Sequence, residues 1–177
     1  MAPDDDVPPE RELTAYHEAG HAVAAAMRGG GELRSITIEP SAAYLGHTGF
    51  RCKPCDTAFV TYAGPWAEAR VQWPLPSLDG EDEDGASFED YVAAAFLRNA
   101  GGDGEDYRHA CEADQALLGE RFAELVATRE QFWGFRELDE HWPAVQAVAQ
   151  LLIAGAAPTD AAVRALVDRP RIKGAER

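Results

Sequence analysis

One segment, residues 10–28, strongly favours a single local structure, a helix. Three consecutive glycines, Gly29 to Gly31, follow it and end any helix there. Within it alanine is abundant, and larger apolar residues recur at helical spacing: Leu13, Tyr16, Val23 and Met27. The preceding residues 1–9 hold two adjacent prolines and three adjacent aspartates, which predicts a disordered lead-in. The sequence therefore predicts a long helix from Glu10 to Arg28.

This helix carries the pattern His-Glu-x-x-His. His17 and His21 are four residues apart, so they lie on one face and can bind the same ion. Imidazole is a preferred zinc donor, and a catalytic zinc keeps three protein ligands and one open position for water. Glu18 lies about 100° around the helix from His17, where it cannot easily be a ligand but can take a proton from that water. We therefore expect one zinc ion (Zn2+) per chain on His17 and His21, with Glu18 as the catalytic base.

Gly20, between the two histidines, supports this interpretation. A glycine inside a helix costs about 1 kcal/mol relative to alanine. Such a cost indicates that another part of the molecule approaches the helix closely at Gly20.

The rest of the chain predicts a mainly helical α+β fold with one small sheet or hairpin. Alternation in Arg34–Glu39 predicts a strand that can pair with Gly46–Phe50. Further helices are expected at Thr57–Gln72, at Phe88–Arg98, from Glu105 onward with breaks near Gly134, Trp142-Pro143 and Gly155–Pro158, and at Asp160–Val167. Residues 75–87, rich in proline, glycine and acidic residues, predict a mobile acidic loop. We expect a single domain at 10–170 and a tail at 171–177.

Charge and composition narrow the partners. The chain has 31 acidic and 16 basic residues, and its net charge of −15 repels phosphate backbones and anionic lipid headgroups. No apolar run approaches the roughly 20 residues that span a bilayer, and the acidic start does not resemble a signal peptide. Three cysteines suit a reducing compartment. We expect a cytoplasmic protein with neither nucleic acid nor membrane as its main partner.

Several blocks resemble the FtsH-type membrane AAA+ metalloproteases. The segment Ala15-Tyr16-His17-Glu18-Ala19-Gly20-His21-Ala22-Val23 resembles the zinc-site helix of that family. Further blocks are similar in the same order: Ile36–Pro40 with Leu45–Thr48 to a strand and a Leu-Gly-aromatic-Thr element, Ala63–Ala69 to a Gly-Gly-Arg-x-Ala-Glu-Glu helix, and Gly102–Ala110 to Gly-Ala-Ser-Asn-Asp-Leu-x-x-Ala. The resemblance covers about residues 13–72 and 101–111, and it implies a zincin-like peptidase domain.

The third zinc ligand must come from a distant part of the chain. The candidates after the hairpin are Glu68, Asp103, Glu105, Asp106 and His109. Asp103 and Glu105 lie in a glycine-broken loop, which would hold a ligand imprecisely. Asp106 stands at the expected start of a helix, where backbone amides can fix its second oxygen. The resemblance also implies Asp106, and we expect this residue, with Glu68 and Asp103 as the alternatives.

The expected activity is that of a zinc metallopeptidase that works without ATP. The only lysines, Lys53 and Lys173, do not lie in a phosphate-binding loop, so we expect no ATP-driven unfoldase. The substrate would then be a peptide or an unfolded protein segment. Two alternatives remain open: a non-catalytic zinc-binding regulatory module, and a zinc hydrolase of small amides. The oligomeric state is also open, with a monomer or dimer as consistent with the sequence as a hexamer.

Weaker signals lie outside this set. Cys52 and Cys55 form a Cys-x-x-Cys, which suits a redox pair or half of a structural zinc site, but without a second pair an incidental turn is favoured. His47 could touch substrate, although an exposed polar residue is the simpler interpretation. His109, one turn from Asp106, could orient a metal ligand.

Overall fold

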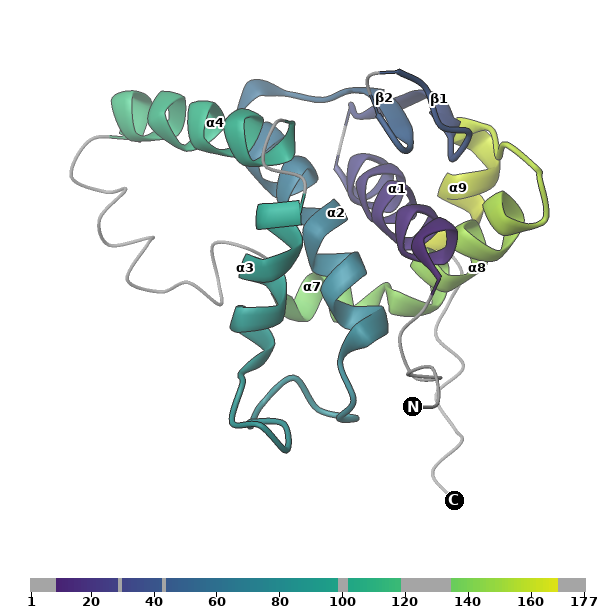
Figure 1. Ribbon diagram of the computed structural model, residues 1–177. Helices are drawn as coiled ribbons and strands as arrows, with labels where there is room; N and C mark the ends of the chain where they lie inside the picture. The colour runs from purple at the N-terminus through teal and green to yellow at the C-terminus, as the bar shows by residue number, and fades with distance from the viewer. Residues whose placement is uncertain (1–8, 29, 43, 99–101, 119–134, 169–177) are drawn as a thin grey trace.

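The computed structural model describes residues 9–28, 30–42, 44–98, 102–118 and 135–168 (Figure 1). In chain order the elements are α1 (Glu10–Met27), β1 (Glu32–Thr37), β2 (His47–Arg51), the 3-10 turn η1 (Pro54–Asp56), α2 (Thr57–Gln72), α3 (Phe88–Arg98), α4 (Asp103–Leu118), α7 (Phe135–Glu140), α8 (Trp142–Ile153) and α9 (Asp160–Val167). This part of the chain is mainly helical with one two-stranded antiparallel sheet, as predicted. Among its helices, none has both the length and the apolar character that crossing a membrane requires.

Most predicted boundaries are confirmed. α2, α3 and α9 begin and end at the predicted residues, and α1 ends one residue early, at Met27. β1 lies two residues before the predicted strand, because the chain turns away after Thr37, whose hydroxyl accepts a hydrogen bond from the Glu39 amide. The predicted lead-in (all but Pro9), the tail at 171–177 and the break near Gly134 lie outside the described residues.

The start of α4 differs from the prediction. The helix begins at Asp103 instead of Glu105, and the amides of Glu105 and Asp106 already bond to the carbonyl of Gly102. The glycine at position 104 is therefore inside the first turn and does not break it. Acidic side chains favour a helix N-terminus because they complement its dipole, and the first turn holds three of them.

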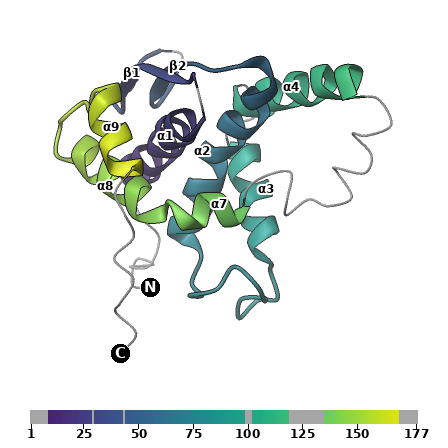
Figure 2. The same ribbon diagram turned by 180° about the vertical axis from the view of Figure 1, so that it is seen from behind.

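Helix α1 lies in the middle of the described fold. Figures 1 and 2 show α2 on one side of it, α8 and α9 on the other, and the sheet across one face. Every residue from Ala15 to Ala26 is buried, including the polar ones. A helix that is buried all round needs neighbours on every side, and the small alanine side chains let those neighbours pack closely.

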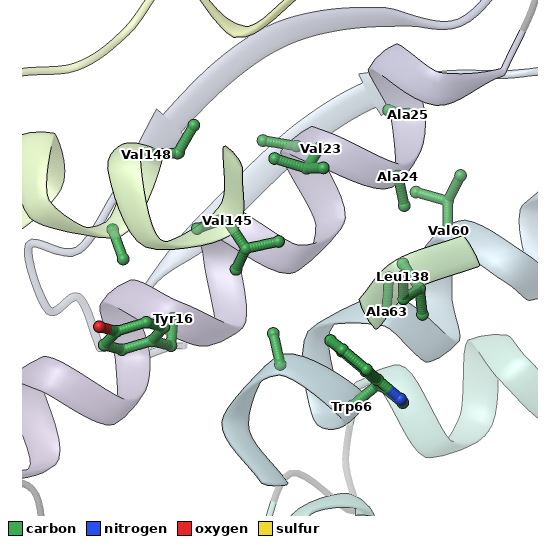
Figure 3. Close-up of a cluster of buried hydrophobic side chains, with 14 of the residues drawn as sticks. Tyr16, Val23, Ala24, Ala25, Val60, Ala63, Trp66, Leu138, Val145 and Val148 are labelled. Atoms are coloured by element: carbon green, nitrogen blue, oxygen red, sulfur yellow. The ribbon is translucent and has the colours of Figure 1, made fainter. Parts of the chain in front are cut away.

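The hydrophobic core lies where α2 and α8 contact α1. Figure 3 shows Val23 facing Val145 and Val148 of α8, and Ala24 near Val60 of α2. The fully buried Trp66 of α2 meets the ring of Trp142 edge to face, with 6.0 Å between the ring centroids. This core fixes the long axis of α1, and therefore the direction in which its histidines point.

The two strands face different neighbours. They pair antiparallel, with Ile36 opposite Thr48 and a bulge between Leu33 and Ser35. The Leu33 amide donates to the carboxylate of Asp160 at 2.8 Å, so β1 is fastened to α9. Figures 1 and 2 show β2 on the opposite side, towards α2 and α4.

The acidic segment between α2 and α3 contains no helix, in agreement with the prediction of a loop. The Asp82 carboxylate accepts hydrogen bonds from the amides of Asp84 and Ala86 and from the hydroxyl of Tyr91. At its other end the Trp73 indole donates to the carbonyl of Ser77 at 2.7 Å. These bonds tie the segment to α3 and to the end of α2.

Gly20 offers a test of the α1–α2 contact. A Cβ atom at this position would collide with the backbone carbonyl of Ala63, which has no room to move. We expect Gly20→Ala to lower the free energy of unfolding by about 1–3 kcal/mol, measured by urea denaturation of the metal-free protein. Gly104→Ala is the matched control, because open space surrounds that helical glycine and stability should stay the same or rise by up to about 1 kcal/mol. Equal effects at both positions would contradict a close approach at Gly20.

Candidate metal centre

The two histidines of α1 point into the crossing with α2. Their side chains are almost fully buried, with 7% of His17 and 5% of His21 exposed. The facing residue on α2 is Gly64, where a Cβ would overlap the Nε2 atom of His21 and lie 2.9 Å from Nε2 of His17. The absence of a side chain at Gly64 therefore makes the space that the two imidazoles occupy.

Hydrogen bonds on the Nδ1 side fix both rings. His21 Nδ1 lies 2.8 Å from the carbonyl oxygen of Val60, and His17 Nδ1 lies 3.0 Å from Oε2 of Glu68. A carbonyl and a carboxylate only accept, so each Nδ1 carries the proton. In neutral imidazole the lone pair is then on Nε2. The two Nε2 atoms lie 3.1 Å apart, facing one another.

The carboxylate of Asp103 completes this cluster. Its Oδ2 lies 2.7 Å from Nε2 of His17 and its Oδ1 lies 3.4 Å from Nε2 of His21. One ligand atom from each of the three residues lies within 4.8 Å of the other two. Two nitrogens bound to one tetrahedral zinc at about 2.0–2.1 Å would be about 3.3 Å apart, close to the separation of the two Nε2 atoms. The cluster of His17, His21 and Asp103 could therefore hold a metal ion.

The electrostatics of the cluster also favour a cation. Burial lowers the pKa of His17, but its hydrogen bonds to Asp103 and Glu68 outweigh this effect and raise the pKa to about 10. Burial raises the pKa of Asp103, while the charge of His21 and the hydrogen bond to His17 lower it well below its usual range. The two Nε2 atoms and the Asp103 carboxylate therefore bind a proton strongly, and a metal ion can bind to the same three groups in its place.

Glu18 lies beside the cluster but is not part of it. Its side chain is buried, and the hydroxyl of Thr48 on β2 donates to its Oε2 at 2.5 Å. The same hydroxyl lies 3.2 Å from the Glu18 carbonyl, so β2 holds both the backbone and the carboxylate. Gly46 leaves room for the other oxygen, because a Cβ there would lie 2.7 Å from Oε1. The carboxylate is therefore held in one place, close enough to His17 for its charge to raise the pKa of that imidazole.

The structure brings Asp103, rather than the predicted Asp106, to the histidines. The difference follows from the start of α4 at Asp103, which gives the supposed loop residue a defined helical position. Asp106 lies three residues further on, about 4.5 Å along the helix axis. Its side chain is exposed and lines a neighbouring groove.

Glu68, the other alternative ligand, contacts the opposite edge of His17. One oxygen meets Nδ1, and the other accepts a hydrogen bond from Arg98 Nε at 2.7 Å. Burial raises the pKa of Glu68, but His17 and then Arg98 lower it overall, so the carboxylate stays ionised. A carboxylate in this position orients a ligating imidazole and makes it more basic.

Sequence reasoning missed the roles of Thr48 and Arg98. Thr48 lies 30 residues from Glu18 and Arg98 lies 30 residues from Glu68, so no local pattern connects the partners. The Thr48 contact depends on strand register, and the Arg98 contact depends on how α3 packs on α2.

The weaker candidates lie outside the cluster. His47 is exposed and packs on Tyr44, with 5.1 Å between ring centroids. His109 is exposed on α4 and lies 3.4 Å from Arg108, not beside a member of the cluster. Cys52 and Cys55 are free thiols, and the nearest polar partner of Cys52 is the hydroxyl of Thr57 at 3.6 Å.

Metal titration should distinguish the two aspartates of α4. We expect Asp103→Ala to weaken zinc binding at least about tenfold, because one of three ligands is removed. Asp106→Ala is the matched control and should bind zinc as the parent protein does. Affinity is measured by competition with a chromophoric chelator, and folding is checked by circular dichroism. The opposite order of effects would show that α4 is positioned differently around the site.

No protein-family model and no curated protein sequence matches this chain. These comparisons identify no family, and the proposed function rests on the residues at the centre.

Proposed function

We propose that this protein is a zinc-dependent metallopeptidase that hydrolyses peptide bonds without ATP. The observation that carries the proposal is the buried Glu18 carboxylate, which is held by Thr48. It lies on the same helix as His17 and His21, which form a cluster with the Asp103 carboxylate. Burying so many ionisable groups is costly unless a cation and hydrogen bonds compensate. In a hydrolytic centre, each of these groups would have a chemical role as a metal ligand or as a proton acceptor.

Zinc is the metal that this set of groups favours. Two histidines and a carboxylate are the ligands of zinc in thermolysin-like enzymes, and the same set binds Fe(II) in some oxygenases. An oxygenase has no need for a buried base beside its ligands, whereas a hydrolase does. Glu18 therefore favours zinc and hydrolysis over iron and oxygen chemistry.

Each protein group has a definable task. His17, His21 and Asp103 would hold the zinc ion, which supplies a Lewis acid that polarises the substrate carbonyl and acidifies water. Glu18 accepts the proton of the attacking water and returns it to the leaving amine. Thr48 donates to one oxygen of Glu18, which leaves the other for this proton. Glu68, paired with Arg98, keeps His17 in its orientation.

The substrate strand is better accommodated by β2 than by β1. On β1, the Leu33 amide bonds to Asp160 and α9 packs on that strand. On β2, Phe50 stacks over His21 with 6.2 Å between ring centroids. We therefore propose that an extended peptide adds beside His47–Arg51, with main-chain hydrogen bonds to the strand. Only an unfolded segment or a peptide can bind in this way.

The two alternatives make different demands on Glu18. A non-catalytic zinc module would gain nothing from a buried carboxylate fixed by Thr48, so this contact argues for turnover. A hydrolase of small amides would use the same centre but would not need the strand edge. Cleavage of an unfolded protein, compared with cleavage of a short amide, separates these two activities.

Replacing the proposed base tests the mechanism. We expect Glu18→Gln to bind zinc as before and to lose at least about a hundredfold in kcat on a fluorogenic peptide, because an amide cannot accept the proton. Glu10→Gln, an exposed acidic residue on the same helix, is the control and should keep full activity. Unchanged turnover in Glu18→Gln would remove this residue from the mechanism.

The dependence on an unfolded substrate and on ATP can be measured with the same protein. We expect casein or a reduced, unfolded protein to be cut and its folded form to resist, because only an extended segment can pair with β2. ATP should change neither rate. Gel analysis of the fragments provides the measurement, and stimulation of the isolated chain by ATP would contradict an ATP-independent enzyme.

A further inference from the structure

A groove of about 420 Å³ lies next to the metal centre. It runs between Phe50 of β2 and Pro54 of η1 on one side and the first turns of α4 on the other. Phe50 also stacks over His21, and Asp106 lies three residues after Asp103 on α4, so the groove begins beside the proposed ligands. Its volume is in the range of sites that hold a small ligand or one long side chain.

The lining of this groove is apolar with one charged group. Phe50, Pro54, Ala110 and Ala113 provide the apolar part, and Asp106 provides a carboxylate. Among the described residues, no hydrogen bond or ion pair engages the Asp106 side chain. Arg108, the basic residue nearest in sequence, is turned to Glu112 at 3.1 Å and to Glu105 at 3.8 Å. The carboxylate is therefore available to a ligand that enters the groove.

This combination fits a long basic side chain. The methylene stem of an arginine or lysine covers apolar surface while its charged end reaches a polar partner. A guanidinium group matches a carboxylate with two parallel hydrogen bonds, so arginine fits better than lysine. His109 also lines the groove, and its Nε2 lies 3.4 Å from the guanidinium of Arg108. The net charge of −15 additionally attracts basic peptides and repels acidic ones.

We propose that Asp106 determines specificity by binding an arginine side chain next to the bond that is cleaved. The inference rests on the proposed peptidase function for its biological meaning, and on the groove alone for its physical basis. It assigns Asp103 to the metal and Asp106 to the substrate, although the two residues share the first turn of one helix.

A pair of peptides that differ only in charge tests the subsite. The probes are two fluorescein-labelled decapeptides with a central arginine or its neutral isostere citrulline. They are titrated by fluorescence anisotropy into the zinc-loaded Glu18→Gln protein, which should bind without cleaving. We expect the arginine peptide to bind about tenfold more tightly, because a charged hydrogen-bonded pair is lost with citrulline.

Two further variants locate the effect. Asp106→Asn, combined with Glu18→Gln, should remove the preference for arginine while the zinc content stays the same. Glu105→Gln in the same background is the matched control, since it deletes an adjacent acidic group that does not line the groove. Equal binding of the two peptides by the Glu18→Gln protein, or a preference that survives Asp106→Asn, would overturn the subsite.

Turnover by the wild-type chain separates this inference from the proposed function. If the arginine preference is present but neither peptide is hydrolysed, the peptidase proposal fails and the subsite stands. If both peptides are hydrolysed at the same rate, and they also bind equally, the peptidase proposal stands and the subsite is overturned. Failure of the arginine peptide to bind at all would also overturn the subsite.

Discussion

The close contact of α1 with α2 is the constraint on which the other features depend. Each helix contributes a glycine to it: Gly20 meets the backbone of Ala63, and Gly64 makes room for the imidazoles. A Cβ atom at Gly20 would push the helices apart, and one at Gly64 would displace the imidazole rings. With the helices at this distance, His21 reaches the Val60 carbonyl and His17 reaches Glu68. Backbone proximity therefore sets the orientation of both rings before any metal binds.

The orientation of the two rings also determines where positive charge is needed in the site. Once both Nδ1 protons are used, the two Nε2 lone pairs and the Asp103 carboxylate face one another in a buried space. Each surrounding carboxylate has its own donor: Thr48 for Glu18, and Arg98 for Glu68. Between the three side chains the compensating charge is either a proton on His17, whose pKa is raised to about 10, or a metal ion that takes its place. The hydrogen bonds around the site thus leave one place, between His17, His21 and Asp103, where a metal ion could bind.

The sequence predicted local features well and long-range geometry less well. The helix of the histidines, the hairpin and the bounds of α2, α3 and α9 follow from periodicity and from helix-breaking residues. The choice between Asp103 and Asp106 depended on where α4 begins, and Gly104 suggested a loop where the structure has a helix. Asp103 and Asp106 are three residues apart and lie near the same face of α4, so the choice depends on which turn of the helix reaches the histidines.

The position of Asp103 at the start of α4 connects the cluster with the neighbouring groove. Asp103 is the first residue of α4, so its carboxylate meets the two histidines at the end of that helix. Further along the same helix, Asp106 and Ala110 line the groove. A change in the packing of α4 would move Asp103 and the groove together. Under the proposed assignments, this one helix would couple metal binding to substrate selection, while Glu18 is held separately by Thr48 of β2.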